Sequence, residues 1–529
     1  MNNHFPLFIQ KLANPALYPH SVKEVKVIET HISWVLLTGL YAYKIKKPVD
    51  LGFLDFSTLE KRHFYCMEEL RLNRRLAPEI YLEVVPICGS QETPHLIGTG
   101  PVFEYAVKMV QFPEQSRLDK ILANGMLGRN EIDDLVTKIA DFHKHIAIAE
   151  QQLLFGTPEF VAQPVTENYQ HIRPLLTVAK DIKRLDGLSF WSEQTFKIHF
   201  NDFQMRKQKG CIRECHGDLH LENIATLNGK LIIFDCIEFS EKLRWIDVIS
   251  EIAFLAMDLE DRGQRPLAHR FINAYLEITG DYDSLKVINY YLVYRAMVRA
   301  KVAIIRLQQN NIDDQQRVNI FTLYNSYISL AEQYTKLTSP TLIITHGLSG
   351  SGKSTLSEFL VEELGAIRIR SDVERKRLFM LSPNKSSNSD VKQGIYTESA
   401  TEMTYQRMED LSNNIVGAGF SVVVDATFLK YWQRNRFFVL ATRLHIPFVI
   451  LDLQAEVDNL KQFIIQRKIK SDNVSEADFK VLEQQIVEQE PLTIEEQSYS
   501  LSINANVSFD KKKIVVELVN KLTGFSIDL

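Results

Sequence analysis

The chain has 529 residues, of which 45% are hydrophobic and 24% charged, and its formal net charge is −5. This length exceeds what one hydrophobic core usually organises, so we expect two or three domains. The mildly acidic balance excludes a surface that coats nucleic acid generally, and no apolar run approaches the ~20 residues of a membrane span. No secretory signal is visible and the five cysteines do not form a disulfide scaffold, so we expect a cytoplasmic protein.

Residues 1–110 are expected to form a strand-rich lobe with one helix. Apolar and β-branched runs predict strands at 25–29, 34–37 and 41–46, and helical periodicity predicts a helix at 58–76 that ends before Pro78. Lys44 and Lys46 lie two residues apart, so both side chains leave the same face of the predicted strand.

Residues 111–335 are expected to be mainly helical, with a compact patch of turns and strands at 211–239. His216-Gly-Asp218-Leu-His-Leu-Glu-Asn223 places an asparagine five residues after an aspartate. Asn228-Gly229 then predicts a hairpin turn, and the following strand ends in Asp235. A carboxylate can accept a hydroxyl proton and a nearby amide oxygen can bind Mg²⁺, so this spacing indicates phosphate-transfer chemistry.

This patch resembles the aminoglycoside phosphotransferase family, whose loop reads H-G-D-x-x-x-x-N before a strand that ends in Asp. The resemblance implies an α+β protein-kinase-like bilobal domain, with an N-lobe at 1–110 and a helical C-lobe at 111–335. It also implies that Asp218 is the catalytic base and that Asn223 and Asp235 bind Mg²⁺.

Such folds use a strand lysine on the nucleotide phosphates, tied to a helix glutamate. Lys44 is the first choice for this lysine and Lys46 the alternative, with Glu68 or Glu69 as partner. The chain lacks a G-x-G-x-x-G loop, and Asp235 is followed by Cys-Ile where protein kinases have Phe-Gly. These departures argue against a regulated protein kinase.

Residues 336–529 are expected to form an α/β P-loop NTPase domain with a parallel sheet. Gly347-Leu-Ser-Gly-Ser-Gly-Lys-Ser-Thr355 fits G-x-x-x-x-G-K-[ST], follows a predicted buried strand and opens a predicted helix. Lys353 is expected on the β- and γ-phosphates and Ser354 on Mg²⁺. The residues expected to contact the nucleotide are Gly347, Gly350, Ser351, Gly352, Lys353, Ser354 and Thr355.

The stretch Ile367-Arg-Ile-Arg-Ser-Asp372-Val-Glu-Arg375 resembles small P-loop kinases, which include polynucleotide kinase, gluconate kinase and zeta-toxin-type kinases. The resemblance implies that Asp372 activates the acceptor hydroxyl and that Arg375 contacts the substrate. Arg467 resembles the lid arginine of these kinases, which stabilises charge in the transition state. Asp425, at the end of a predicted strand, is a secondary candidate for Mg²⁺ or substrate.

The chain as a whole resembles bacterial two-part proteins that join an aminoglycoside-phosphotransferase-like domain to a P-loop kinase. Resistance to aminoglycosides is not implied. The sequence predicts an ATP- and Mg²⁺-dependent phosphotransferase with two nucleotide-binding modules, which acts on hydroxyl groups of a small molecule, a sugar nucleotide or a nucleic-acid end. The alternative is a nucleotide-switched regulatory protein with one active P-loop ATPase and a degenerate kinase-like module. The sequence leaves the oligomeric state open.

Overall fold

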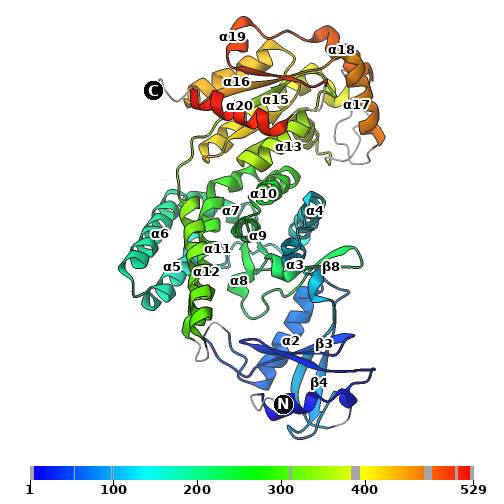
Figure 1. Cartoon of the computed structure of the whole chain (residues 1–529), viewed down its shortest axis with the longest axis vertical. Coiled ribbons are helices and arrows are strands. Elements are labelled where there is room, and N and C mark those ends of the chain that lie inside the picture. The colour runs from blue at the N-terminus through cyan, green and yellow to red at the C-terminus, as the bar shows by residue number, and fades with distance from the viewer. Residues whose placement is uncertain are drawn as a thin grey trace. The chain divides into compact units, whose positions relative to one another are not determined.

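The computed structural model describes residues 5–52, 54–96, 98, 100–308, 312–382, 393–469, 479–506 and 510–524. The chain forms two compact units (Figure 1). The first comprises Met1–His171 and Phe200–Asp258, and the second comprises Ile172–His199 and Leu259–Leu529. The three domain ranges expected from the sequence remain a prediction.

The first unit contains an antiparallel sheet, several helices and two small strand pairs. Its strands are β1 (Lys26–Glu29), β2 (Ser33–Leu37), β3 (Tyr41–Lys46), β4 (Tyr81–Gly89), β5 (Pro94–His95), β6 (Val102–Val110), β7 (Ile212–Glu214), β8 (Ile224–Leu227), β9 (Lys230–Ile233) and β10 (Trp245–Asp247). Its helices are α1 (Leu7–Leu12), α2 (Leu59–Asn73), α3 (Leu118–Ala123), α4 (Arg129–His145), α5 (Pro158–Ile172), α7 (Phe200–Gln208), α8 (Glu241–Arg244) and α9 (Val248–Asp261), of which α5 and α9 run on into the second unit.

The antiparallel sheet has the order β1-β2-β3-β6-β4-β5 and carries an apolar cluster on each face. Adjacent residues of β6 show the alternation, because Ala106 joins the cluster around α1 while Val107 joins the cluster around α2. Helix α2 begins where the Thr58 hydroxyl accepts the Lys61 N–H, and its Cys66 packs beside Val107 in the second cluster. The sheet and α2 therefore form the kinase-like N-lobe that the sequence predicts.

The predicted catalytic patch is built from two short strand pairs. β10 pairs with β7, and β8 pairs with β9 through the Asn228-Gly229 turn, whose residues have φ angles of 51° and 75°. Both residues adopt the left-handed conformation that such a two-residue hairpin requires. The hairpin places Asp235 two residues after the end of β9.

The second unit contains the predicted glycine-loop domain and, before it in the chain, a group of helices. These helices are α6 (Ala179–Ile198), α10 (Arg265–Thr279), α11 (Leu285–Ile305) and α12 (Asp314–Tyr334). The glycine-loop domain contains β11 (Leu342–His346), α13 (Lys353–Leu364), β12 (Ile367–Arg370), α14 (Ser371–Leu378), α15 (Glu398–Gly417), β13 (Val422–Asp425), α16 (Tyr431–Leu444), β14 (Phe448–Gln454), α17 (Val457–Ile469), α18 (Phe479–Glu488), α19 (Ile494–Ser498), β15 (Ser500–Asn504) and α20 (Lys511–Gly524).

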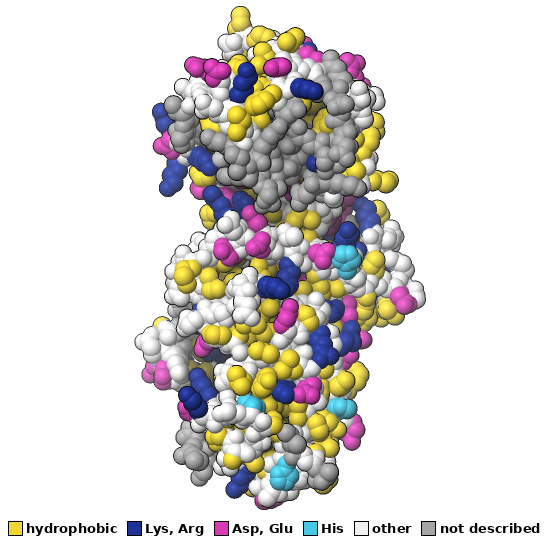
Figure 2. Space-filling view, turned by 90° about the vertical axis from the view of Figure 1, so that its right-hand side faces the viewer, with side chains coloured by type: hydrophobic (Ala, Val, Ile, Leu, Met, Phe, Trp, Pro, Cys, Tyr) yellow, Lys and Arg dark blue, Asp and Glu magenta, His cyan; other side chains and the backbone are white. Residues whose placement is uncertain are grey.

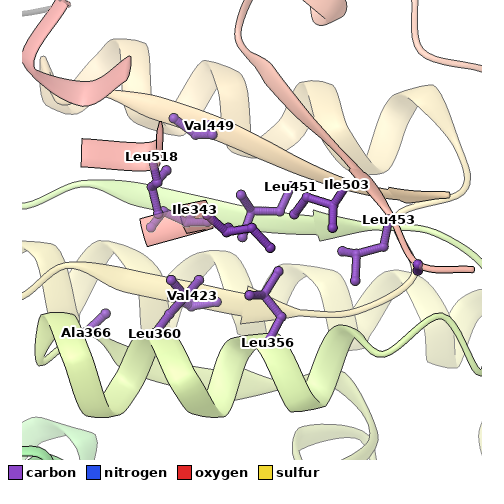
Figure 3. Close-up of a cluster of buried hydrophobic side chains, with 12 residues drawn as sticks. Ile343, Leu356, Leu360, Ala366, Val423, Val449, Leu451, Leu453, Ile503 and Leu518 are labelled. Carbon is purple, nitrogen blue, oxygen red and sulfur yellow. The ribbon is translucent and has the colours of Figure 1, made fainter. Parts of the chain in front are cut away.

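The sheet of the glycine-loop domain is parallel throughout, with the order β12-β13-β11-β14-β15. Figure 3 shows the core between this sheet and α13, where Leu356 and Leu360 point toward Ile343 and Val423 of the central strands. Helix α13 ends at Gly365, whose φ of 67° fits the left-handed cap expected there. The expected α/β domain with a parallel sheet is confirmed.

The surface of the described residues carries charges of both signs. Lysine and arginine side chains are interspersed with aspartate and glutamate on the face drawn in Figure 2. Among the described residues, no helix has the length and apolar character needed to cross a membrane.

Leu360→Ala is expected to destabilise the glycine-loop domain by about 2–5 kcal/mol, because the fully buried side chain would leave a cavity between α13 and the sheet. Hydrogen exchange of the amides in β11 and α13 measures this local stability in the whole chain. Leu337→Ala removes the same atoms from a fully exposed side chain and serves as the control. Equal exchange in the two variants would contradict the assigned core.

Candidate functional site

The two strand lysines lie on the α2 side of the N-lobe sheet. Tyr43 and Ile45 pack into the opposite apolar cluster, so alternation along β3 turns Lys44 and Lys46 toward α2. There the Glu69 carboxylate meets both: Lys44 Nζ lies 2.8 Å from Oε1 and Lys46 Nζ lies 2.7 Å from Oε2. The structure thus identifies Glu69 as the helix partner of both lysines.

Glu68, the other glutamate that the sequence left open, is not the partner of either lysine. Its carboxylate binds the guanidinium of Arg71 at 2.9 Å and lies 3.6 Å from that of Arg244. Glu68 and Glu69 are neighbours on a helix and leave it about 100° apart, so only one of them can face β3.

The environments of the two lysines differ. Lys46 has 1% of its side chain exposed, lies over the Phe56 ring and forms a second ion pair with Glu238. Lys44 has 13% exposed, and its Nζ lies 2.6 Å from Oδ1 of Asp235. Lys44 therefore joins the sheet to the residue expected to bind metal, whereas Lys46 is enclosed by the N-lobe and Glu238.

Charge pairing outweighs burial in this cluster. Burial alone would lower the pKa of Lys44, but the carboxylates of Asp235 and Glu69 hold it well above its usual range. Burial alone would raise the pKa of Glu69, but the two ammonium groups lower it to about 2. Lys44 and Glu69 are therefore both charged at neutral pH.

Asp235 adopts a left-handed backbone conformation, with φ of 64°, that is uncommon for a residue with a side chain. Two hydrogen bonds stabilise this conformation. The Asp235 N–H donates to the Tyr81 hydroxyl at 3.1 Å, and the Cys236 N–H donates to Asn73 Oδ1 at 2.9 Å. The carboxylate is 47% exposed. Left-handed residues held by their surroundings in this way cluster at functional sites.

The catalytic loop brings Asp218 and Asn223 into direct contact. The Asn223 Nδ2 donates to both the backbone oxygen and Oδ2 of Asp218, each at 3.0 Å. The Phe234 N–H donates to the backbone oxygen of Asn223 at 2.9 Å, which places the loop beside the segment that carries Asp235. The structure thus brings Asp218 and Asn223 into contact and places the segment of Asp235 beside their loop, while their roles in proton acceptance and metal binding stay predictions.

His216 supports this loop as a neutral imidazole. Its Nδ1 accepts the Asp218 N–H at 3.3 Å, so Nε2 carries the proton and donates to the Phe234 backbone oxygen at 2.9 Å. Burial lowers the pKa of His216, which favours this uncharged form. The imidazole therefore connects the start of the loop to the strand before Asp235.

Two acidic residues of α9 accept hydrogen bonds from the backbone of the catalytic loop, although the sequence analysis assigned them no role. Glu251 Oε1 accepts the Gly217 N–H at 2.7 Å, and Asp258 Oδ2 accepts the Leu221 N–H at 2.9 Å. His143 Nε2 lies 2.8 Å from the other oxygen of Glu251. The signal available in the sequence was the presence of Glu251 and Asp258 within the apolar stretch of this helix.

The glycine loop closes over its own lysine. Lys353 Nζ donates to the backbone oxygens of Gly347 at 3.0 Å and Leu348 at 2.7 Å. Gly350 and Gly352 have φ angles of 92° and 87°, which side chains rarely tolerate. Three further residues complete the set that the sequence predicts for nucleotide contact: Ser351 is buried, and Ser354 and Thr355 are exposed at the start of α13.

Asp425 ends β13 beside the first turns of α13. Its Oδ2 accepts a hydrogen bond from the Ser357 hydroxyl at 3.1 Å, one turn beyond Ser354. Asp372 lies in the first turn of α14, two residues after Arg370, whose Cα is the register partner of Asp425. Both acids therefore lie at the carboxyl ends of neighbouring strands, where ligands bind in open α/β sheets.

Arg375 is buried rather than open to a substrate. Its Nη1 donates to the Ile395 backbone oxygen at 2.9 Å and to the Thr401 hydroxyl at 3.2 Å, and its guanidinium lies over the Tyr396 ring. Its predicted role in substrate binding stays a prediction. Arg467 belongs to α17, but its side chain lies outside the described residues.

Gln485 contacts the glycine loop, although the sequence assigned it nothing. Its Oε1 accepts the Ser349 N–H at 2.9 Å from α18. An isolated glutamine far along the chain carries no motif, so only the fold reveals this contact.

Comparison with known proteins assigns the chain to a family. The Mycobacterium tuberculosis protein Rv2004c is 30% identical over 451 residues, which cover 84% of this chain and 86% of the relative. The Mycobacterium bovis protein Mb2027c matches to the same extent. The chain belongs to the family of these mycobacterial proteins. Residues 342–492 of this chain, which contain the glycine loop, also match a domain family described as an AAA domain.

Among solved structures, this family member is similar to a choline/ethanolamine kinase family protein from Mesorhizobium loti. The two are 11% identical with a TM-score of 0.37, over 62% of this chain and 99% of that one. A putative kinase from Chloroflexus aurantiacus is 18% identical with a TM-score of 0.29, over 35% of this chain and 100% of that one. The predicted combination of a kinase-like domain and a P-loop domain is confirmed. The antiparallel sheet with its catalytic loop supports the first, and the parallel sheet, the glycine loop and the AAA-domain match support the second.

Lys44→Met and Lys46→Met are expected to separate nucleotide binding from stability. Lys44→Met leaves Glu69 paired with Lys46, so the fold should persist while nucleotide affinity of the N-lobe falls. Lys46→Met leaves the buried Glu238 without its cation and should cost about 3–5 kcal/mol of stability.

Calorimetric titration with ATP and Mg²⁺ and urea unfolding, both in a Lys353→Ala background, measure the two effects. If the affinity for ATP falls only in Lys46→Met, Lys46 and not Lys44 is the lysine that binds the nucleotide.

Proposed function

We propose that the protein is an ATP-dependent phosphotransferase with two nucleotide sites, which transfers the γ-phosphate to hydroxyl acceptors. The kinase-like and P-loop folds support a phosphotransferase. The observation that carries the proposal for the first unit is the contact of Lys44 with both Glu69 and Asp235, which joins strand, helix and catalytic patch across 191 residues of sequence.

The donor set of the first site fits a magnesium nucleotide. Asp235 offers a half-exposed carboxylate, and Asn223 uses its amide nitrogen on Asp218 while its amide oxygen is the type of ligand that Mg²⁺ accepts. Bound Mg²⁺ would neutralise charge on the phosphates. Glu69 would orient Lys44 toward those phosphates, and Asp218 would accept the proton of the acceptor hydroxyl.

The second site fits a nucleotide through its loop. Backbone N–H groups of the glycine loop and the amino terminus of α13 favour anionic phosphates. Lys353 would exchange its two loop carbonyls for phosphate oxygens, and Ser354 with Asp425 would hold Mg²⁺. Asp372 would take the acceptor proton, because it lies beside the strand that carries Asp425.

The supported acceptor class is a small molecule or a nucleotide, with a nucleic-acid end as the alternative. Charges of both signs are mixed on the surface, and the net charge is −5, which does not favour a long nucleic-acid duplex. The competing function, a nucleotide-switched regulator, requires slow hydrolysis without transfer. A test with labelled ATP against pools of metabolites, nucleosides and nucleic-acid ends separates the two.

The two sites are expected to lose activity independently. Lys353→Ala should abolish transfer by the P-loop site, because it removes a phosphate contact, and Asp235→Ala should abolish transfer by the kinase-like site, because it removes a Mg²⁺ ligand. Transfer from labelled ATP is measured for each single variant and the double variant of the whole chain. Lys513→Ala and Asp141→Ala, whose side chains are 74% and 72% exposed, are matched controls. Full transfer by the double variant would overturn the proposal.

Asp372→Asn is expected to lower turnover of the P-loop site by about 10²–10⁴, since the amide keeps the shape but accepts no proton. Affinity for ATP should barely change. Steady-state kinetics and calorimetry in an Asp235→Ala background measure the two quantities, and exposed Asp410→Asn is the control. Loss of ATP affinity with normal turnover would move Asp372 to the nucleotide side of the site.

A further inference from the structure

Strand β12 carries two arginines on one face of the glycine-loop sheet. Arg368 and Arg370 alternate with Ile367 and Ile369, and their side chains are 8% and 17% exposed. β12 is an edge strand of the sheet. Two guanidinium groups buried side by side need a nearby counter-charge to be stable.

The counter-charge comes from α10, which precedes the glycine-loop domain and lies outside the residues that match the AAA domain. Glu277 Oε2 binds Arg368 Nη2 at 3.0 Å, and its Oε1 binds Arg370 Nη1 at 2.8 Å. Burial alone would raise the pKa of Glu277, but the two arginines lower it to about 2. One carboxylate thus serves both arginines.

Helix α10 packs against β12 and α13 of the glycine-loop domain. It lies beside α13 (Figure 1) and contacts β12. The Asn273 Oδ1 accepts the Arg368 N–H at 2.7 Å, and Arg270 pairs with Glu362 of α13 at 3.0 Å. Glu277 is therefore held in place by its own helix rather than by the arginines alone.

Both arginines lie next to residues of the predicted P-loop site. Arg368 Nη1 lies 3.4 Å from the Ser354 backbone oxygen and 3.5 Å from the hydroxyl of Ser357, which itself donates to Asp425. Arg370 lies within electrostatic reach of both Asp425 and Asp372. Arg370 is thus attracted by Glu277 on one side and by the two acids of the site on the other, while Arg368 lies between Glu277 and the first turns of α13.

We propose that Glu277 is a positioning residue of the P-loop site, which holds Arg368 and Arg370 away from Asp425 and Asp372. The proposal rests on the proposed phosphotransferase function. Both guanidinium groups are paired with Glu277, and among the described residues neither Asp425 nor Asp372 forms an ion pair. Loss of its charge turns Arg370 toward Asp425, where it competes with Mg²⁺, and toward Asp372, where it disfavours acceptance of a proton.

The test uses the whole chain in an Asp235→Ala background, so that nucleotide binding reports the P-loop site. Glu277→Gln is expected to raise the Mg²⁺ concentration needed for half-maximal ADP binding by about tenfold, the order expected when a carboxylate gains an arginine partner. Calorimetry at a series of Mg²⁺ concentrations measures the shift, and thermal unfolding confirms that the variant is folded. A structural role alone would not move the Mg²⁺ requirement of a folded protein.

Two further variants sharpen the test. Glu358→Gln is the matched control, because Glu358 also lies 3.4 Å from Arg368 Nη1 but is 44% exposed, and its Mg²⁺ requirement should match the parent. Adding Arg370→Gln to Glu277→Gln removes the competing cation and should restore the parental requirement.

A folded Glu277→Gln protein with an unchanged Mg²⁺ requirement overturns the proposal. If Glu277→Gln does not fold, Arg370→Gln alone decides: an unchanged or lower Mg²⁺ requirement supports the proposal, and a higher one overturns it. If the parent shows no ADP binding that Lys353→Ala abolishes, the proposed function itself fails, which is a different result from unchanged Mg²⁺ dependence.

Discussion

Burial of charge is the constraint on which both halves of this protein depend. In each half a single buried carboxylate holds two cations of one strand, Glu69 for Lys44 and Lys46, and Glu277 for Arg368 and Arg370. Two neighbouring buried cations repel each other and lose their hydration, so the carboxylate on the adjacent helix stabilises both strands where they lie. In both halves the cations lie next to the residues that we assign to chemistry.

The consequence for the kinase-like half is that the catalytic patch is positioned by hydrogen bonds and ion pairs rather than by apolar packing alone. Lys44 connects β3 to Asp235, and the neutral His216 connects the loop to the strand before it. Glu251 and Asp258 fix backbone N–H groups from the opposite side. Such a network has one favourable arrangement, which is what a reaction that depends on sub-ångström placement requires.

The sequence predicted the elements and motifs well, because they are local. Strand alternation placed Lys44 and Lys46 on one face, and the spacing of Asp218 and Asn223 predicted that the two act together, as their contact in the structure allows. The choice of Glu69 over Glu68 required the direction in which α2 presents its side chains.

Contacts between distant segments were beyond reach from the sequence. Glu277 lies about 90 residues before the arginines that it binds, and Gln485 lies 136 residues after the N–H that it accepts. Neither residue belongs to a motif with fixed spacing. Arg375 shows the same limit, since its motif suggested a substrate contact, which stays a prediction, and only the fold reveals its hydrogen bond to the Ile395 backbone.

The hydrogen bond from the Arg368 backbone N–H to Asn273 covers the edge of β12 and affects where the chain can be cut into fragments. A chain that begins at the boundary near residue 336 keeps every strand of the parallel sheet but lacks α10, so the outer N–H of Arg368 and two buried guanidinium groups become uncovered. An open strand edge of this kind templates pairing with other chains. A P-loop fragment that starts before Arg265, ahead of α10, keeps Asn273 and Glu277 and so keeps this strand edge covered.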